Sequence, residues 1–167
     1  MKNNIRRYLA CDLGAESGRL IRGILENGRL FLDEIHRFQN IPVRSGDSLH
    51  WDLSSLQDEI SVGLKKAGAL GESFESISCD SWGVDYVLYD SQGTHINPTF
   101  HYRDPRTAEG VKNIFKRLPW ESIFMESGIQ FMPLNALFQM GAETSDRLNA
   151  AASFGGVGDA FNHWLGG

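Results

Sequence analysis

Apolar residues near the start of the chain fall into three runs that are separated by short polar turns. The first run covers 7–11, and the next two, 19–25 and 29–38, flank Asn27 and Gly28. Asn-Gly between two apolar runs is a strong signal for a two-residue hairpin. The pattern therefore predicts three strands in an antiparallel meander.

A helical pattern replaces the strand pattern after Asp52, which is a typical N-cap residue. The apolar positions that follow at helical spacing are Leu53, Leu56, Ile60, Leu64 and Ala67. Glycines at 68 and 71 indicate where the helix ends, and its apolar stripe predicts that it covers one face of the sheet. The short run 76–79 then predicts a fourth strand. We expect it to lie parallel to the first, because a helix joins the two by a right-handed crossover.

The second half of the chain is less regular. Strand-like runs on either side of a polar turn at 90–93 predict a second hairpin or an extension of the sheet. Three helices follow: one begins at Asp104 and Pro105, one runs from Pro119 to Gly128, and one follows Pro133. The apolar stripe expected to be buried on the first of them consists of Ala108, Val111, Phe115 and Leu118.

A glycine-rich link at 154–158 precedes an amphipathic segment at the end of the printed sequence. We expect Asp159 to cap this segment, with Phe161, Trp164 and Leu165 on one side. Because little of the chain remains for it to pack on, it is predicted to fray.

Composition indicates an ordinary globular protein of 167 residues, 41% hydrophobic, with a formal net charge of −5. A net acidic chain argues against a nucleic-acid partner, and no apolar run approaches the roughly 20 residues that span a bilayer. No targeting segment is expected. Cys11 and Cys79 both fall in predicted buried strands, which favours free thiols in a cytoplasmic protein. Small molecules are the expected partners.

The stretch around the first turn is the strongest chemical signal. Asp12 follows the first strand, and Gly14, Ser17, Gly18 and Arg19 come directly after it. Glycines allow positive φ and a close approach of phosphate to the backbone, while a hydroxyl and a guanidinium donate to anions. This favours a phosphate loop with a metal-associated aspartate. The alternative is a polar turn without a ligand, and the stretch matches neither the Walker nor the GxGxxG pattern.

A second candidate region is dense in aromatic and polar residues. Its members are Trp82, Asp85, Tyr86, His101, Tyr102, Arg103 and Asp104. They are interpreted either as core aromatic residues with solvated charges or as a sugar-binding surface, since aromatic faces with carboxylates and arginine suit a sugar.

Several stretches together resemble a known family: DLGAESGR at 12–19, EIHRF at 34–38, DSWGVD at 80–85, YRDPRT at 102–107 and SGIQFMPLNALFQ at 127–139. They resemble the N-terminal domain of the FGGY carbohydrate kinases, most closely the members that act on L-rhamnulose. The predicted element order is also that of this α/β fold, the ribonuclease H-like (actin-like ATPase) domain. Its mixed sheet has an antiparallel three-stranded meander plus parallel strands, flanked by helices.

The resemblance implies transfer of the γ-phosphate of ATP to the 1-hydroxyl of L-rhamnulose, with Mg²⁺ as the cofactor. Asp12 matches the metal-linked aspartate of the family, and Gly83 matches a glycine that contacts the sugar. Trp82 and Asp85 flank Gly83 and are further candidate sugar contacts. The residues that match the first ATP-contacting loop are Ala15, Glu16, Ser17, Gly18 and Arg19.

The general base of the family, an aspartate in a His-Asp pair, is not found in the printed sequence. We therefore expect 1–167 to be the N-terminal kinase domain, with the base and the C-terminal ATPase domain beyond Gly167, and to be inactive alone. Three alternatives remain: a ribonuclease H-like nuclease with Asp12 and Asp80 as metal ligands, a non-catalytic sugar-binding or regulatory module, and an FGGY kinase for another ketose.

Overall fold

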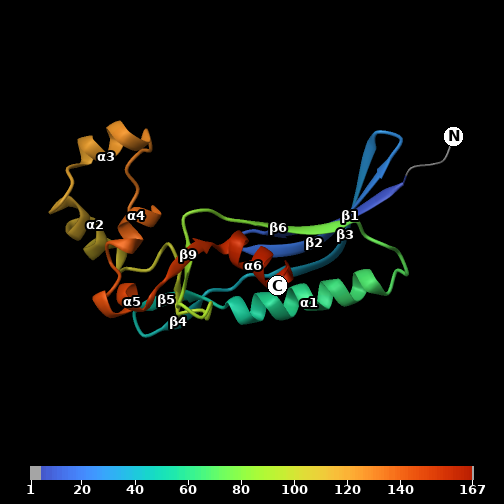
Figure 1. The fold of residues 1–167 in the computed structure, drawn as a ribbon, viewed down its shortest axis with the longest axis horizontal. Coiled ribbons are helices and arrows are strands. Elements are labelled where there is room, and N and C mark those ends of the chain that lie inside the picture. Colours follow the sequence, from blue (N-terminus) through green and yellow to red (C-terminus); the bar gives the residue numbers. More distant parts are fainter. Residues whose placement is uncertain (1–4, 167) are drawn as a thin grey trace. The chain divides into compact units, whose positions relative to one another are not determined.

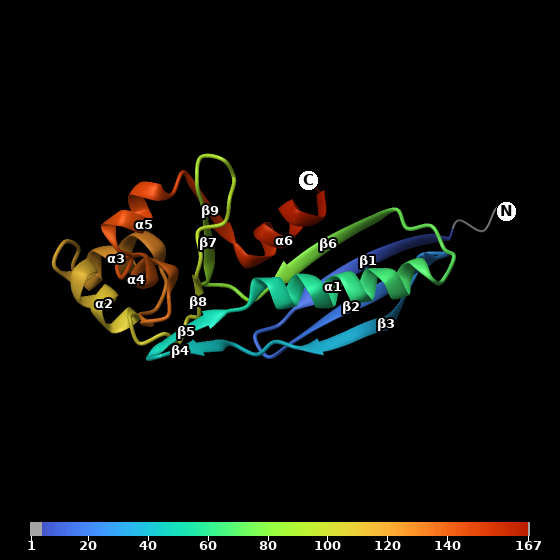
Figure 2. The ribbon, with the colours of Figure 1, turned by 90° about the horizontal axis from the view of Figure 1, so that it is seen from below.

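The computed structural model describes residues 5–166, and these divide into two compact units. Unit 1 takes the described residues of Met1–Ile41, Asp52–Trp82 and Val157–Gly167, and unit 2 takes Pro42–Trp51 and Gly83–Gly156. Figures 1 and 2 together label their elements. Among the helices of residues 5–166, none combines the length and the hydrophobicity that a membrane-spanning segment needs.

Unit 1 contains a four-stranded sheet in the order β3-β2-β1-β6. The strands are β1 (Arg6–Leu13), β2 (Ser17–Glu26), β3 (Arg29–Gln39) and β6 (Ser76–Ser81). The first three pair antiparallel and β6 pairs parallel with β1, so the predicted meander and crossover are confirmed. Asn27 and Gly28 both have positive φ, as the tight turn of a two-residue hairpin requires. Figure 2 shows β3 at one edge of this sheet and β6 at the other.

Helix α1 (Leu53–Gly68) lies along one face of the sheet and confirms the predicted helix (Figure 2). The Asp52 side chain accepts a hydrogen bond from the Ser55 amide at 2.9 Å and caps the first turn. Leu56 and Ile60 are buried on the face that meets the strands. Gly63 belongs to the same face, where a Cβ would lie 3.1 Å from the side chain of Leu20. The helix therefore packs closely on β2 because this position lacks a side chain.

Helix α6 (Val157–Gly166) corrects the expectation that the last segment has little to pack on. Val157 and Phe161 are buried in the hydrophobic core of unit 1. The Asn162 side chain also binds the backbone of Cys79: its Nδ2 donates to the carbonyl at 2.7 Å and its Oδ1 accepts from the amide at 2.8 Å. Asp159 lies inside the first turn of the helix rather than at its cap. The prediction failed because the core that covers these residues comes from strands distant in the sequence.

Cys11 and Cys79 are opposite each other on the neighbouring strands β1 and β6. Both are buried free thiols, as predicted. A hydrogen bond with the Cys11 thiol, together with burial, raises the pKa of Cys79, so both side chains act as small core residues rather than as nucleophiles.

Unit 2 has two small sheets, β4-β5-β8 and β7-β9, and four short helices. Its elements are β4 (Val43–Ser45), β5 (Ser48–Trp51), β7 (Tyr86–Tyr89), β8 (Thr99–Phe100), α2 (Thr107–Phe115), α3 (Trp120–Ser127), α4 (Ala136–Met140), α5 (Ser145–Ala150) and β9 (Ser153–Gly156). The second hairpin was predicted only in part. The 90–93 turn is present with one bridge, Tyr89 to His95, but the main partner of β7 is β9.

The predicted buried stripe of α2 is wrong. Ala108, Phe115 and Leu118 are exposed, and the buried positions of the helix are Thr107 and Gly110. A Cβ on Gly110 would lie 1.8 Å from the carbonyl oxygen of Phe138, so the α2 backbone lies directly on α4. A contact between backbones leaves no apolar periodicity for a sequence pattern to detect. The helix from 120 to 127, which ends at a left-handed Gly128, is confirmed.

Candidate functional site

The turn between β1 and β2 is fixed by hydrogen bonds to its carbonyl groups. The Gly14 amide donates to the Ser17 carbonyl at 2.9 Å, and buried Asn40 donates through its amide to Glu16 O and through Nδ2 to Gly14 O, both at 3.0 Å. In contrast, the Ala15 and Glu16 amides donate to no group within residues 5–166. Two adjacent N–H groups at a rigid turn are suited to an anion. No sequence pattern indicates this role of Asn40, because the role depends on the end of β3 lying beside this turn.

The two glycines of this turn do not provide the positive φ angles that the sequence analysis expected. Neither Gly14 nor Gly18 is among the described residues with positive φ. A Cβ on Gly14 would lie 2.9 Å from the Ser17 carbonyl oxygen, and one on Gly18 would lie 2.3 Å from the ring of Phe38. They are therefore needed for close packing, because a side chain at either position would displace a strand or the turn.

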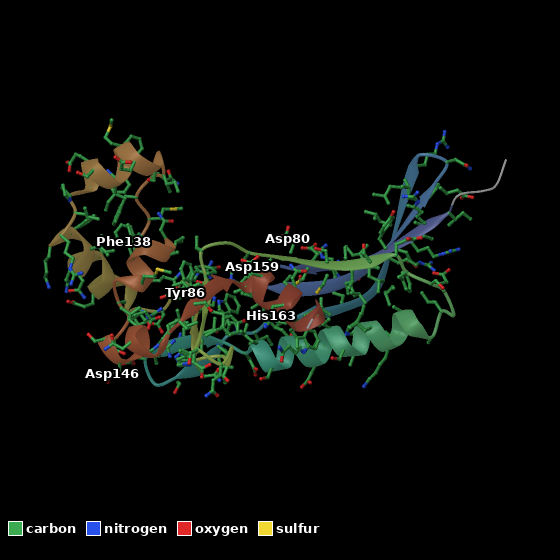
Figure 3. All side chains as sticks on the ribbon, in the orientation of Figure 1. Asp80, Tyr86, Phe138, Asp146, Asp159 and His163 are labelled. Atoms are coloured by element: carbon green, nitrogen blue, oxygen red, sulfur yellow. The ribbon has the colours of Figure 1, made fainter. Side chains whose placement is uncertain are left out.

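The register of the sheet brings the charged candidates of unit 1 together. Asp12 lies opposite Arg19 on β2 and opposite Asp80 on β6. Arg19 Nε lies 3.1 Å from Asp12 Oδ2, and the Asp12 side chain remains 48% exposed. Figure 3 labels Asp80 on β6, where it too is exposed. The pairing of two carboxylates at adjacent strand ends, predicted from the sequence, is present in the structure.

These two carboxylates fit the requirements of Mg²⁺, which binds through one or two carboxylates and completes its octahedron with water and phosphate oxygens. No group of three or more His, Cys, Asp or Glu side chains suited to a metal occurs in the described chain. A protein-only metal cage is therefore absent from the described residues, and the ion would need phosphate oxygens from a nucleotide.

The candidate sugar residues divide between the units. Trp82 belongs to unit 1, where its indole packs against the core and its amide donates to Leu13 O at 3.1 Å. Gly83 and Asp85 belong to unit 2. Gly83 is exposed, and a Cβ there would meet no atom within 4 Å. It lies outside the strands, so the glycine is not required by a β-bulge.

Asp85 is 4% exposed, and its two oxygens accept hydrogen bonds from distant side chains. Trp51 Nε1 donates to Oδ2 at 2.6 Å, and Gln139 Nε2 donates to Oδ1 at 2.7 Å. Gln139 Nε2 also lies 3.2 Å from the carbonyl oxygen of Val84, a β-branched residue held at φ +70°. Such a conformation persists only where the surroundings impose it. Asp85 therefore fixes the backbone that presents Gly83.

Trp51 continues this cluster through stacked rings. Its indole lies 4.2 Å from the His101 ring, which in turn lies 4.3 Å from Tyr102. Burial, with a contribution from Arg103, lowers the pKa of His101 to about 4. Since its Nδ1 accepts from the Arg103 amide at 2.9 Å, His101 is a neutral imidazole with the proton on Nε2.

The interpretation of this region as core aromatics with solvated charges is right for Tyr86, which is buried, and wrong for Asp85 and Asp104. Burial alone would raise the pKa of Asp104, but hydrogen bonds from Ser48, Leu49 and Arg106 outweigh it and hold the pKa below its ordinary value. These carboxylates are buried because fixed donors replace water.

Glu143 forms a second buried charged group in unit 2. It accepts from Arg147 Nε at 2.8 Å and from the Tyr86 hydroxyl at 2.8 Å, and it pairs with Arg106 Nη1 at 3.1 Å. Arg106 also lies over the Phe100 ring at 3.6 Å. Burial and the neighbouring Glu143 raise the pKa of Tyr86. Every charge here has a partner, so the cluster ties the start of α2, the α4–α5 connection, α5 and β7 together.

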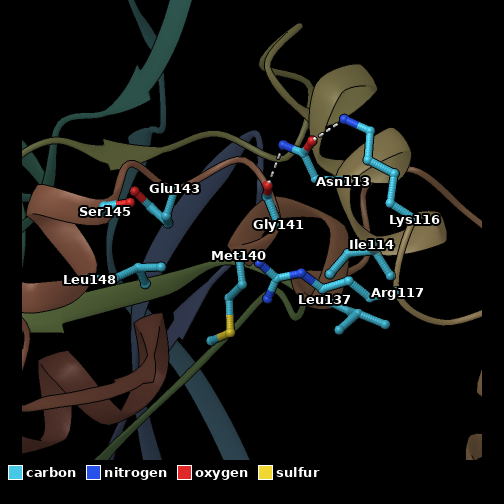
Figure 4. Close-up of a pocket in the computed structure, with 10 residues that line it drawn as sticks. All are labelled: Asn113, Ile114, Lys116, Arg117, Leu137, Met140, Gly141, Glu143, Ser145 and Leu148. Carbon is cyan, nitrogen blue, oxygen red and sulfur yellow. Dashed lines mark hydrogen bonds between the residues drawn. The ribbon is translucent and has the colours of Figure 1, made fainter.

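Unit 2 also contains a cavity of about 470 Å³ beside α2, α4 and α5, drawn in Figure 4. Its rim carries Lys116, which donates to Asn113, and Asn113 in turn donates to the Gly141 carbonyl. None of the residues predicted from the sequence as ATP, sugar or metal ligands lines this cavity.

Comparison with known proteins confirms the family resemblance. The chain is 37% identical to a rhamnulokinase of Oceanobacillus iheyensis over 162 residues, which is 95% of this chain and 34% of that protein. It is 40% identical to a rhamnulokinase of Mannheimia succiniciproducens over 168 residues, 98% of this chain and 35% of that protein. The chain thus spans about a third of the length of the curated relatives it matches. None of the models of known protein families matches it.

The fold comparison agrees with the sequence comparison. The crystal structure of a xylulose kinase from Rhodospirillum rubrum matches with a TM-score of 0.77 and 16% identity, covering 95% of this chain and 34% of that chain. The predicted fold, an actin-like ATPase domain with a mixed sheet, is therefore confirmed. The chain is homologous to rhamnulokinases over most of its own length, and its structural neighbours are FGGY-type carbohydrate kinases.

Proposed function

We propose that this chain is the N-terminal part of an ATP-dependent kinase that phosphorylates the 1-hydroxyl of L-rhamnulose, with Mg²⁺ as cofactor. The observation that carries the proposal is 37–40% identity to rhamnulokinases over nearly the whole chain. The geometry of the β1–β2 turn and of the Gly83–Asp85 loop agrees with it. A ribonuclease H-like nuclease is not favoured, because the chain carries a net charge of −5.

In this proposal, the 15–19 loop binds the nucleotide phosphates. The amides of Ala15 and Glu16 donate to phosphate oxygens, and the Ser17 hydroxyl and the Arg19 guanidinium lie on the following strand. The Glu16 side chain is exposed, and its carboxylate pairs with no residue in the described part of the chain. We therefore assign its contribution to the main-chain N–H. Arg19 is already paired with Asp12, so binding of an anion there also releases the carboxylate for a cation.

Asp12 and Asp80 would hold Mg²⁺ in this reaction. The ion neutralises charge on the transferring phosphoryl group when it is bound. The role of the two side chains is to position it at the end of β1 and β6, beside the turn. Since phosphoryl transfer depends on positioning and charge neutralisation, loss of either carboxylate reduces rate more than it reduces folding.

The sugar half of the proposal rests on Gly83. Its exposed backbone has open space at the Cβ position, and the loop behind it is fixed by Asp85, Trp51 and Gln139. A polyol can approach bare backbone closely there. We assign Gly83 to direct contact with the sugar and Asp85 to positioning of the loop, and Trp82 of unit 1 stays a candidate sugar contact.

The proposal is tested by assaying ADP release with ATP, Mg²⁺ and L-rhamnulose. The protein encoded by the complete reading frame is compared with chain 1–167, and ATP and sugar binding by the short chain are measured by calorimetry. We expect sugar-dependent turnover only from a protein that supplies the His-Asp pair. Sugar binding with no turnover by the complete protein would favour the non-catalytic module, and faster turnover with another ketose would favour a different kinase specificity.

A further inference from the structure

The tip of the β2–β3 hairpin exposes an unusual run of apolar side chains. Leu30, Phe31 and Leu32 are 61%, 52% and 67% exposed, and they are consecutive on β3. β3 is the end strand of its sheet, and no other described strand pairs with its outer edge. Long edge strands with exposed apolar residues are templates for pairing with another chain.

Hairpin geometry determines which backbone groups face outward. The two-residue Asn27–Gly28 turn makes Glu26 and Arg29 a hydrogen-bonded pair, and the ladder then alternates. Arg29, Phe31 and Asp33 therefore direct their N–H and C=O groups toward β2. Leu30 and Leu32 direct theirs toward the open edge, where a new strand would have to bind them.

The sequence of this segment is Arg-Leu-Phe-Leu-Asp, so a positive charge and a negative charge lie at equal distances on either side of Phe31. If two copies pair antiparallel about a two-fold axis at Phe31, Leu30 meets Leu32 of the other copy in hydrogen-bonded pairs. Phe31 then meets Phe31, and Arg29 meets Asp33. Two neighbouring registers also match the outward groups, with Leu30 or Leu32 on the axis, but neither places Arg29 opposite Asp33.

The charges at the two ends are available for this pairing. Arg29 is exposed and forms no ion pair with any residue in the described part of the chain. Asp33 is 58% exposed and bonds Arg22 Nη2 at 2.8 Å through one oxygen, which leaves its other oxygen open. Opposite charges directly across antiparallel strands stabilise the pair, and like charges destabilise it.

We propose that the outer edge of β3 is an interface for a second copy of this chain, with a two-fold axis at Phe31. Each copy contributes Leu30 and Leu32 to the backbone pairing, and two Arg29–Asp33 ion pairs flank the paired phenylalanines. The interface is isologous, so it closes as a dimer rather than growing into a fibre. A five-residue ribbon is small, so we expect a dissociation constant of roughly 0.1 mM.

The first test uses charge exchange, measured by sedimentation equilibrium of chain 1–167. Arg29→Asp places two acids on each edge, and Asp33→Arg places two bases there. For each variant alone, the dissociation constant of the dimer should therefore rise by at least about tenfold. In an equimolar mixture the acids of one variant face the bases of the other, and dimers should return. Met125→Glu, at an 80% exposed apolar position of α3 in the other unit, is the control and should leave dimerisation unchanged.

The second test uses single cysteines and does not depend on the stability of the charge variants. The native cysteines are buried, so Phe31→Cys should form a disulfide-linked dimer on mild oxidation, because residues on the axis lie about 4.5 Å apart in Cα. Leu30→Cys and Leu32→Cys, equally exposed, should not, since each faces the other position. The proposal is overturned by cross-linking that is equal at all three positions or stronger at 30 or 32, by mixtures that stay monomeric, or by the wild-type chain remaining monomeric at about 1 mM.

Discussion

The chain presents carboxylates in two contrasting settings. In unit 1, Asp12 is half exposed and meets Arg19 and Asp80 through the register of neighbouring strands. In unit 2, Asp85 is almost completely buried and accepts from Trp51 and Gln139, which lie 34 and 54 residues away in the sequence. The first setting is open to a ligand and to water. The second has replaced water with protein donors.

The difference separates binding from positioning. An exposed ion pair contributes little to folding because water and salt screen it, so Asp12 is free to be used by a cation. A buried carboxylate with two short hydrogen bonds is expensive to disturb, because its loss leaves the donors without partners. We therefore expect substitutions in unit 1 to change rate and those around Asp85 to change stability.

The largest expected effect is that of Asp12→Asn on turnover. Under the proposed function, kcat of the protein encoded by the complete reading frame should fall by about 10²- to 10³-fold, because the proposed Mg²⁺ would lose a ligand beside the phosphates. The free energy of unfolding should change by less than about 1 kcal/mol, since only a half-exposed pair with Arg19 is lost. Glu34→Gln, which removes the exposed partner of Arg37 on β3, is the matched control and should retain kcat. Near wild-type turnover in Asp12→Asn would contradict the metal assignment.

Asp85→Ala should mainly lower stability, whereas Asp12→Asn mainly lowers turnover. Trp51 Nε1 and Gln139 Nε2 would lose their acceptor in a buried site, and urea unfolding should report a loss of about 3 kcal/mol. Asp146→Ala, at an exposed carboxylate in the same unit (Figure 3), should change stability by less than about 0.5 kcal/mol. Unchanged stability in Asp85→Ala, combined with lost sugar binding, would make Asp85 a direct ligand instead.

The stability of unit 2 should also depend on pH through His101. Its pKa is about 4 in the folded chain and about 6.5 when unfolded. Above pH 6.5 both states are neutral and the group has no effect. Between pH 6.5 and 4 only the unfolded state gains the proton, so stability should fall with decreasing pH by at most about 1.4 kcal/mol per unit. Unfolding free energies measured at several pH values should show this slope, and His101→Gln should flatten it; an unchanged slope would place its origin elsewhere.

The smallest effect is expected at Gly83. In the complete enzyme, Gly83→Ala should raise KM for L-rhamnulose by about threefold to tenfold and leave KM for ATP unchanged. Stability should be retained, because the new Cβ meets no atom within 4 Å. Gly110→Ala is the contrasting control in the same unit, since its Cβ would overlap the Phe138 carbonyl and should lower stability. Equal rises in both KM values for Gly83→Ala would remove Gly83 from the sugar pocket.

The elements that the sequence predicted correctly are those with a local cause. The Asn27–Gly28 turn, the Asp52 cap and the spacing of Leu56 and Ile60 are each decided within a few residues, and they fixed the meander and α1. The position of Asp12 and Asp80 at the ends of adjacent strands also followed, because a parallel crossover joins β1 and β6.

Only the tertiary structure decided the features that depend on distant partners. Asn40 holds the Gly14–Glu16 turn, Gln139 and Trp51 hold Asp85, and β9 pairs with β7 across more than sixty residues. A short polar segment shows no periodicity that identifies its partner, and a glycine such as Gly110 does not reveal which backbone will lie against it. By itself the sequence determined the fold class and the chemistry of the strand ends. Long-range hydrogen bonds and close backbone contacts decided which carboxylates stay open and which are buried, because these depend on groups that meet only in the folded chain.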